Sequence, residues 1–349
     1  MRSSLFRACV VLVVLLLSQF AFATSYQITD VGAFDDLWIT GSNNLGQVVG
    51  VIDSHTGFLW SPGIGFTYLP CIEGFDSSIP EAVNSNGQIV GYSMYSGGSS
   101  RACLWEQGKP VLDLDPHPTG QYRPTSTANG INESGQVVGR STLGTPYMHG
   151  FLRSPDGDME NITGDSQSYE PLAVNDKGVV LGQHGSLPFL WDRTNGLRDL
   201  ELPVYANWPI GINNSGRVVL ASVYGWGYGD AYVWDEETGY QILGSLPGKH
   251  QWAAPEDMNN SGQVVGRSSD QPFVWDDTNG IQPLPKLPDH GYVIASAIND
   301  SGQIAGSSLD SSGDWHLVLW TPVPEPSSLL AMLGGVGCLI GLRKRRRIA

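Results

Sequence analysis

Apolar residues between positions 26 and 320 occur in short runs, separated by turns rich in Gly, Asn, Asp and Pro. Such runs predict β-strands rather than helices. The pattern Asn-x-x-Gly followed by a β-branched strand occurs seven times, beginning at Asn43, Asn84, Asn132, Asn175, Asn213, Asn259 and Asn299. The spacings of 41, 48, 43, 38, 46 and 40 residues indicate an internal structural repeat.

Each repeat contains further strand and turn signals. Asn can hydrogen-bond its own backbone and Gly can adopt the left-handed conformation, so Asn-x-x-Gly predicts a hairpin turn. The strand after this turn closes with Gly in six copies, with Leu220 as the exception, which predicts close backbone packing. The next apolar strand ends in Trp, except at Arg153; these residues are Trp60, Trp105, Trp191, Trp234, Trp275 and Trp320. Runs such as Trp275–Gly280 predict a second hairpin.

Four short strands in each repeat predict one blade of a β-propeller. The last repeat stops at Trp320, without the strand that should follow it. The first strand, Tyr26–Asp30, lacks the two strands that should precede it. We therefore predict an all-β, seven-bladed β-propeller over residues 24–322, whose N-terminal strand completes the last blade. An open β-solenoid is the alternative, but it would not need this exchange.

Residues 1–23 have the features of a secretory signal peptide. Arg2 and Arg7 give the first residues a positive charge, and the uninterrupted apolar run Ala8–Leu17 follows them. Ala21–Ala23 then offers small residues to signal peptidase. A permanent membrane anchor is the alternative, but the apolar run is short for a bilayer. We predict export.

Residues 323–349 combine three features in order. The first is a short motif, Pro324, Glu325 and Pro326, and the second is an uncharged segment, Leu329–Leu342. The third is a basic cluster: Arg343, Lys344, Arg345, Arg346 and Arg347. As a helix the uncharged segment would reach about 21 Å, against about 30 Å of hydrocarbon. We predict a short transmembrane helix with the basic cluster on the cytoplasmic side.

This tail resembles the PEP-CTERM sorting signal of Gram-negative bacteria. The resemblance implies that an exosortase, an integral-membrane cysteine protease, recognises Pro324, Glu325 and Pro326 and processes the protein for the envelope or surface. A plain C-terminal membrane anchor is the alternative. The repeats resemble the HAF repeats of bacterial extracellular proteins, most closely at His149–Leu152 and His316–Trp320. That resemblance implies an architecture and a surface setting, without an activity.

The charge balance excludes nucleic acid as a partner. The formal net charge is −15, and seven of the 19 basic residues lie in the leader and tail. The remaining 12 face the chain's 34 acidic residues, a balance of −22 that repels phosphate backbones.

Catalytic and metal motifs are absent from the sequence. No two of the seven histidines have metal-ligand spacing, and no GxSxG motif occurs. The acidic turns, such as Asp235–Glu237, do not match an EF-hand, which leaves weak calcium binding as an alternative. We predict no cofactor. Whether Cys71 and Cys103 pair in an oxidising compartment stays open.

Aromatic residues outside the regular strand ends are the candidate ligand contacts, in particular Trp226 and Tyr228 in a Gly-rich run. Aromatic platforms stack on sugar rings. We predict a non-enzymatic cell-envelope or matrix interaction protein associated with exopolysaccharide. Signal peptidase and exosortase are its partners during export, and the C-terminal helix holds it in the membrane before processing. The alternatives are an extracellular carbohydrate-active enzyme, a hydrolase or lyase, and a structural surface spacer.

Overall fold

A computed structural model describes residues 25–115, 125–142, 147–164, 169–200, 206–224, 227–248 and 251–323. These residues form strands β1 to β28, arranged in seven four-stranded sheets, and no helix. The chain divides into two compact units. One is Ile28–Trp320, the propeller; the other joins Met1–Gln27 with Thr321–Ala349, and only residues 25–27 and 321–323 of it are described.

The seven sheets are the blades, numbered here in chain order. Blade 1 contains β2 (Leu37–Ser42), β3 (Val48–Ile52), β4 (Thr56–Ser61) and β5 (Gly65–Tyr68). Blade 2 contains β6 (Ser77–Val83), β7 (Gln88–Met94), β8 (Ser100–Glu106) and β9 (Leu112–Asp113). Blade 3 contains β10 (Ser126–Ile131), β11 (Val137–Ser141), β12 (His149–Arg153) and β13 (Met159–Asn161). Blade 4 contains β14 (Tyr169–Val174), β15 (Val180–His184), β16 (Leu187–Asp192) and β17 (Gly196–Asp199).

The remaining blades follow the same order, and only the last takes a strand from the other end of the chain. Blade 5 contains β18 (Ala206–Ile212), β19 (Val218–Tyr224), β20 (Gly227–Asp235) and β21 (Gly239–Ile242). Blade 6 contains β22 (Ala254–Met258), β23 (Val264–Ser268), β24 (Gln271–Asp276) and β25 (Gly280–Pro283). Blade 7 contains β26 (Tyr292–Ile298), β27 (Ile304–Leu309), β28 (Trp315–Val323) and β1 (Ser25–Phe34).

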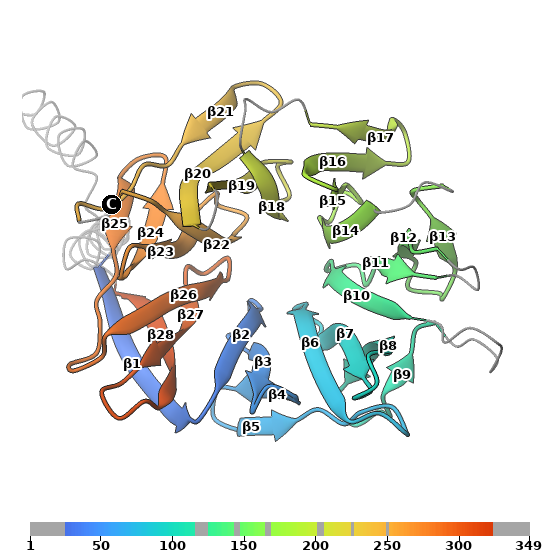
Figure 1. Ribbon diagram of the computed structural model, residues 1–349, viewed down its shortest axis with the longest axis horizontal. Coiled ribbons are helices and arrows are strands. Elements are labelled where there is room, and N and C mark those ends of the chain that lie inside the picture. The colour runs from blue at the N-terminus through green and yellow to red at the C-terminus, as the bar shows by residue number, and fades with distance from the viewer. Residues whose placement is uncertain are drawn as a thin grey trace, which may run out of the picture. The chain divides into compact units, whose positions relative to one another are not determined.

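The blades stand around a central opening, with the first strand of each blade innermost and the last outermost (Figure 1). In blade 7 the order β26-β27-β28-β1 places the N-terminal strand beside β28. Asp30 Oδ2 lies 3.0 Å from His316 Nδ1 across this pair. The predicted seven-bladed propeller, completed by its N-terminal strand, is confirmed.

The repeated glycines have the two roles that the sequence predicts. The Gly of every Asn-x-x-Gly turn has a positive φ, from +73° at Gly46 to +95° at Gly216. The Gly that closes the second strand lies against the inner strand instead: a Cβ on Gly91 would stand 2.0 Å from the Ile79 carbonyl oxygen. In blade 5, where Leu220 replaces this Gly, the inner strand has an additional irregularity between Ala206 and Trp208.

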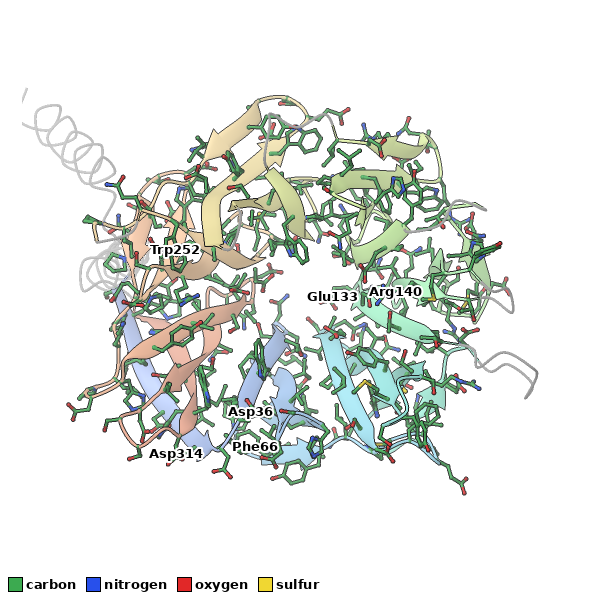
Figure 2. All side chains as sticks on the ribbon, in the orientation of Figure 1. Asp36, Phe66, Glu133, Arg140, Trp252 and Asp314 are labelled. Carbon is green, nitrogen blue, oxygen red and sulfur yellow. The ribbon has the colours of Figure 1, made fainter. Side chains whose placement is uncertain are left out.

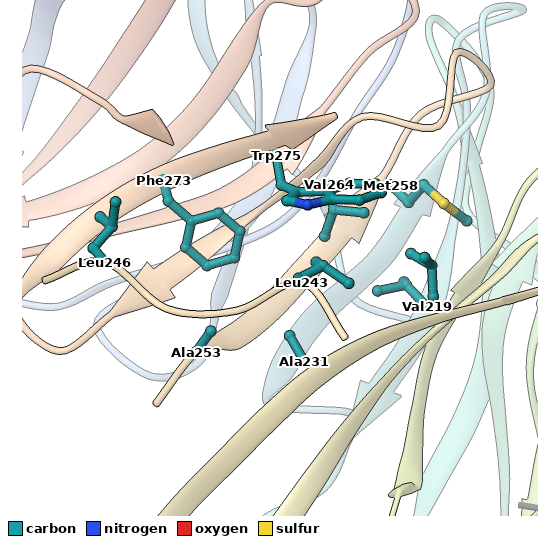
Figure 3. Packing of buried hydrophobic residues seen from close by; sticks show 10 residues of the cluster. Val219, Ala231, Leu243, Leu246, Ala253, Met258, Val264, Phe273 and Trp275 are labelled. Carbon is teal, nitrogen blue, oxygen red and sulfur yellow. The ribbon is translucent and has the colours of Figure 1, made fainter. Parts of the chain in front are cut away.

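The hydrophobic core lies between neighbouring blades. Between blades 5 and 6, for example, Val219 and Ala231 pack with Val264, Phe273 and Trp275 (Figure 3). The third strands of four blades each contribute a fully buried phenylalanine: Phe58, Phe151, Phe189 and Phe273. Burying each of these side chains stabilises the fold by about 2 kcal/mol. The repeated core therefore joins the blades and leaves the inner strands free to line the channel.

Candidate functional site

Most of the site residues predicted from the sequence lie outside the described residues. These are the leader 1–23, the motif Pro324, Glu325 and Pro326, the apolar span, the basic cluster Arg343 to Arg347, and Trp226. Tyr228 belongs to β20, but its side chain also lies outside the described part. Their proposed roles stay predictions from the sequence.

One end of the central channel is surrounded by a ring of the seven repeat asparagines. Each Asn donates a hydrogen bond from Nδ2 to the backbone carbonyl of the next Asn around the ring, at 2.9–3.5 Å. The last bond, from Asn299 to Asn43, crosses from blade 7 to blade 1. Each Oδ1 accepts the backbone N–H four residues on, at 2.9–3.0 Å. The ring thus fixes every hairpin turn to its neighbour.

A cavity of about 210 Å³ at this end is lined by residues from all seven blades. Its carboxylates are engaged in further bonds between blades: Glu133 accepts from Ser85 N, Asp176 from Glu133 N, and Asp300 from Asn260 N. Figure 2 places Glu133 at the edge of the central opening. Burial opposes the ionisation of Asp300, but hydrogen bonds from Asn260 and Asn44 outweigh it and lower its pKa. These acids therefore link neighbouring turns of the ring.

Further along the channel, each inner strand has a bulge three residues before the repeat Asn. The register of β6 shifts between Pro80 and Ala82, which makes Glu81 the bulged residue, and Glu256 is its equivalent in β22. Asn129 holds the same position in β10, and its side chain donates 2.7 Å to the Pro171 carbonyl on the next inner strand. Bulged residues therefore reach along the channel wall.

Glu81 belongs to a cluster of four titratable side chains, with Tyr92, Arg140 and Glu170. Arg140 Nη1 lies 3.3 Å from Glu170 Oε1, and Gln183 donates 3.2 Å to Glu170 Oε2. Burial, together with the charge of Glu170, raises the pKa of Glu81 to about 7. Burial raises the pKa of Tyr92 as well, and the Glu81 charge adds to that shift. Figure 2 labels Arg140 on blade 3.

A second group of charged side chains lies on blade 6. Burial raises the pKa of Glu256 to about 7 although Arg267 favours its ionised form, and burial raises the pKa of Asp257 to about 7. The Glu256 side chain meets solvent, so its loss of hydration arises from the channel walls rather than from a sealed core. Arg267 lies over the rings of Trp252 and Tyr292, at 4.9 and 4.4 Å from their centroids.

Two exposed tryptophans occupy equivalent positions on inner strands. Trp38 on β2 and Trp208 on β18 each precede their repeat Asn by the same five residues, and they are 63% and 53% exposed. β2 contacts the inner strands β6 and β26, and β18 contacts β14 and β22. Both indoles are therefore exposed on strands that border the central opening. Three blades separate the two residues around one side of the ring, so they stand on nearly opposite sides.

A larger groove of about 1000 Å³ lies at the turns of blades 4 and 5 and includes the ring of Trp234. Its two arginines are paired: Arg198 with Glu236 at 3.0 Å, and Arg217 with Asp277 at 2.6 Å. The charges of both arginines in the groove are therefore already neutralised.

The remaining candidate groups have structural partners. Within the described ranges, no three His, Cys, Asp or Glu side chains are placed to hold a metal ion. His316 lies between Asp30 and Asp310 in blade 7, and His290 contacts Ser308. Asp235 caps its own turn by accepting from the N–H groups of Glu237 and Thr238, while weak calcium binding stays a prediction. Cys71 and Cys103 are free thiols.

The fold and this channel define a seven-bladed β-propeller with a polar, partly aromatic centre. One similar solved structure is a catalytically inactive virginiamycin B lyase from Staphylococcus aureus with quinupristin: 9% identity, 86% of this chain, 100% of that chain, TM-score 0.60. Another is YCF48 bound to D1 peptide: 11% identity, 86% and 98% coverage, TM-score 0.51. Such likeness shows the fold alone. No curated protein matches the sequence significantly.

The C-terminal residues show how the protein is sorted. Residues 322–347 match the PEP-CTERM protein-sorting motif. The chain is therefore an exported, exosortase-sorted protein with a cell-envelope or surface location. Among the residues that the structure describes, no helix is long and apolar enough to cross a membrane. The predicted C-terminal transmembrane helix falls outside those residues.

Sequence reasoning counted Trp38 among the aromatic residues outside the regular strand ends, but it missed Glu81, Glu256 and Trp208. Glu81 and Glu256 each lie three residues before a repeat Asn and directly after a proline. Trp38 and Trp208 each lie five residues before a repeat Asn. Aligning the seven repeats on their asparagines would have revealed both coincidences.

Proposed function

We propose that this protein is a non-enzymatic interaction protein of the cell envelope or matrix that binds a glycan of exopolysaccharide in its central channel. The observation that carries the proposal is the pair of exposed tryptophans, Trp38 and Trp208, at equivalent positions on inner strands. Indole faces bury apolar area against sugar rings, and their N–H groups remain available to hydroxyls. Glu81 and Glu256 on the channel wall supply acceptors for sugar hydroxyl groups.

The test uses the full-length chain purified in detergent and the exopolysaccharide isolated from the producing organism. Retention on the polymer is measured with and without calcium, while the chain length of the polymer is followed. Trp38→Ala and Trp208→Ala are each expected to weaken binding about fivefold or more, since one stacking contact contributes about 1 kcal/mol. Tyr68→Ala is the matched control, because Tyr68 is 58% exposed but lies on the outer strand of blade 1.

The other outcomes distinguish the alternatives. Trp226→Ala and Tyr228→Ala examine the aromatic pair proposed from the sequence. Equal retention of the Trp38, Trp208 and Tyr68 variants would refute the channel as the binding site. If the protein is not retained on the polymer and the polymer is not shortened, the result would favour the structural spacer.

One observation favours a carbohydrate-active enzyme as the second candidate. Glu81, with a pKa of about 7, lies near Glu170, whose carboxylate is paired with Arg140. Two carboxyl groups in different environments can act as acid and base in glycoside cleavage. Shortening of the polymer that Glu81→Gln abolishes would establish this candidate in place of the first.

A further inference from the structure

Glu81 and Glu256 are unusual among the carboxylates of the channel because they lack a donor. Neither side chain accepts a hydrogen bond from the residues that the structure describes. By contrast, Glu170 has Arg140 and Gln183, and Asp257 accepts from the backbone N–H groups of Met258 and Ile298 at 2.7 and 2.8 Å. Both unpartnered groups occupy the bulged position of their inner strands.

The cations close to these carboxylates are already committed. Arg140 pairs with Glu170, and Arg267 is stacked over Trp252 and Tyr292. Burial of Glu81 disfavours its ionised form and raises its pKa to about 7, and the surrounding channel walls have the same effect on Glu256, although its side chain meets solvent. A ligand that carried positive charge would relieve that unfavourable state, whereas an anionic ligand would worsen it.

The aromatic residues of the channel favour the same kind of ligand. The face of an indole carries negative electrostatic potential and attracts ammonium groups, most strongly where water is partly excluded. Trp38 and Trp208 expose such rings on the inner strands β2 and β18. The acidic balance of the chain outside its ends also draws cations toward the surface.

We propose that the channel recognises a cationic group, of the class of the ammonium of an amino sugar, through the carboxylates of Glu81 and Glu256 and the indoles of Trp38 and Trp208. This inference rests on the proposed glycan binding and names the class of sugar. Aromatic faces supply stacking for the ring, and the carboxylates distinguish a free amine from its neutral acetylated form.

The experiment compares three oligosaccharides of equal length by calorimetry with the full-length chain in detergent. They are an oligomer of glucosamine, an oligomer of N-acetylglucosamine and an oligomer of galacturonate. The glucosamine oligomer is expected to bind about tenfold tighter than the acetylated one, the effect of one charge-assisted contact. Glu81→Gln and Glu256→Gln are each expected to reduce that preference, and Glu73→Gln, at an exposed site in the connection between blades 1 and 2, is expected to leave it unchanged.

A permanently charged probe separates the titration of the protein from that of the amine. Tetramethylammonium alone is expected to bind more tightly at pH 8 than at pH 6, because its own charge is constant while the two carboxylates ionise between these values. Binding of tetramethylammonium that is equal at both pH values would count against Glu81 and Glu256.

Each remaining outcome has one meaning. Equal binding of the amino and acetylated oligomers, lost in Trp38→Ala, would overturn this inference and leave the proposed glycan binding intact. A preference for the galacturonate oligomer would also overturn it. Binding of none of the three, with no retention on exopolysaccharide, would remove both proposals together. A preference that survives in the double variant E81Q/E256Q would show that other residues select the amine.

Discussion

The asparagine ring joins all seven blades, and Asn84→Ala measures how much stability one member contributes. The buried Asn84 side chain donates to the Asn132 carbonyl at 3.0 Å and to Gln88 Oε1 at 2.9 Å. Its Oδ1 accepts from the backbone N–H groups of Asn86 and Gln88 at 3.1 and 3.0 Å. At about 1 kcal/mol for each bond, and more where a buried donor is left unsatisfied, we expect a loss of about 3–5 kcal/mol in the free energy of unfolding.

Urea denaturation followed by tryptophan fluorescence measures this loss. The matched control is Asn86→Ala, two residues along the same turn, which removes one exposed hydrogen bond from Asn86 Nδ2 to the Glu133 carbonyl. That change is expected to alter the free energy of unfolding by less than about 1 kcal/mol. If Asn84→Ala lost no more stability than Asn86→Ala, the ring would not be what holds adjacent blades together.

The remaining predictions concern single sites. Gly91→Ala would place a Cβ 2.0 Å from a main-chain oxygen and should lower the free energy of unfolding by about 3 kcal/mol or more. Gly211→Ala, whose Cβ would lie 3.9 Å from the nearest side-chain atom, should be tolerated. Equal effects of the two changes would contradict the close packing at Gly91. Glu81→Gln should leave the free energy of unfolding unchanged at pH 4 and increase it by about 1–3 kcal/mol at pH 8. The reason is that the pKa of the Glu81 carboxyl rises from 4.5 to about 7 on folding. A stability gain at pH 4 that is absent at pH 8 would contradict this reasoning. Alkylation of the native protein at pH 8 should modify Cys71 and spare the buried Cys103, whose pKa burial raises to about 12; mass spectrometry showing equal labelling would refute this.

The architecture could be predicted because its determinants are local. A hairpin turn needs Asn and a left-handed Gly at fixed spacing, and the six-fold recurrence of a strand-closing Gly has a steric cause that Gly91 illustrates. Even the exchange of strands at blade 7 could be inferred, because the strand missing after Trp320 and the unpaired one at Tyr26–Asp30 complement each other. The sorting tail was likewise recognised from the order of its three parts.

The channel could not be predicted in the same way. A bulge interrupts the alternation of a strand, so the pattern around Glu81 does not tell which way its side chain points. The pKa of Glu81 depends on its burial and on Glu170, two blades away, and both exist only after blades 2, 3 and 4 have packed together. Tryptophan is a residue type that is usually buried, and Trp208 is exposed only because β18 lies at the edge of the opening.

The pairing of β1 with β28 has a consequence for the order of events during export. The contact between Asp30 and His316 spans 286 positions, so the N-terminal strand reaches the far side of the membrane long before its partner does. Until then β1 is an open strand edge, which other chains could pair with. Ring closure must therefore be a late and slow step, because the longest loop in the chain has to close for it. A chain that stalls in translocation would be left without its last blade and with two uncovered apolar faces.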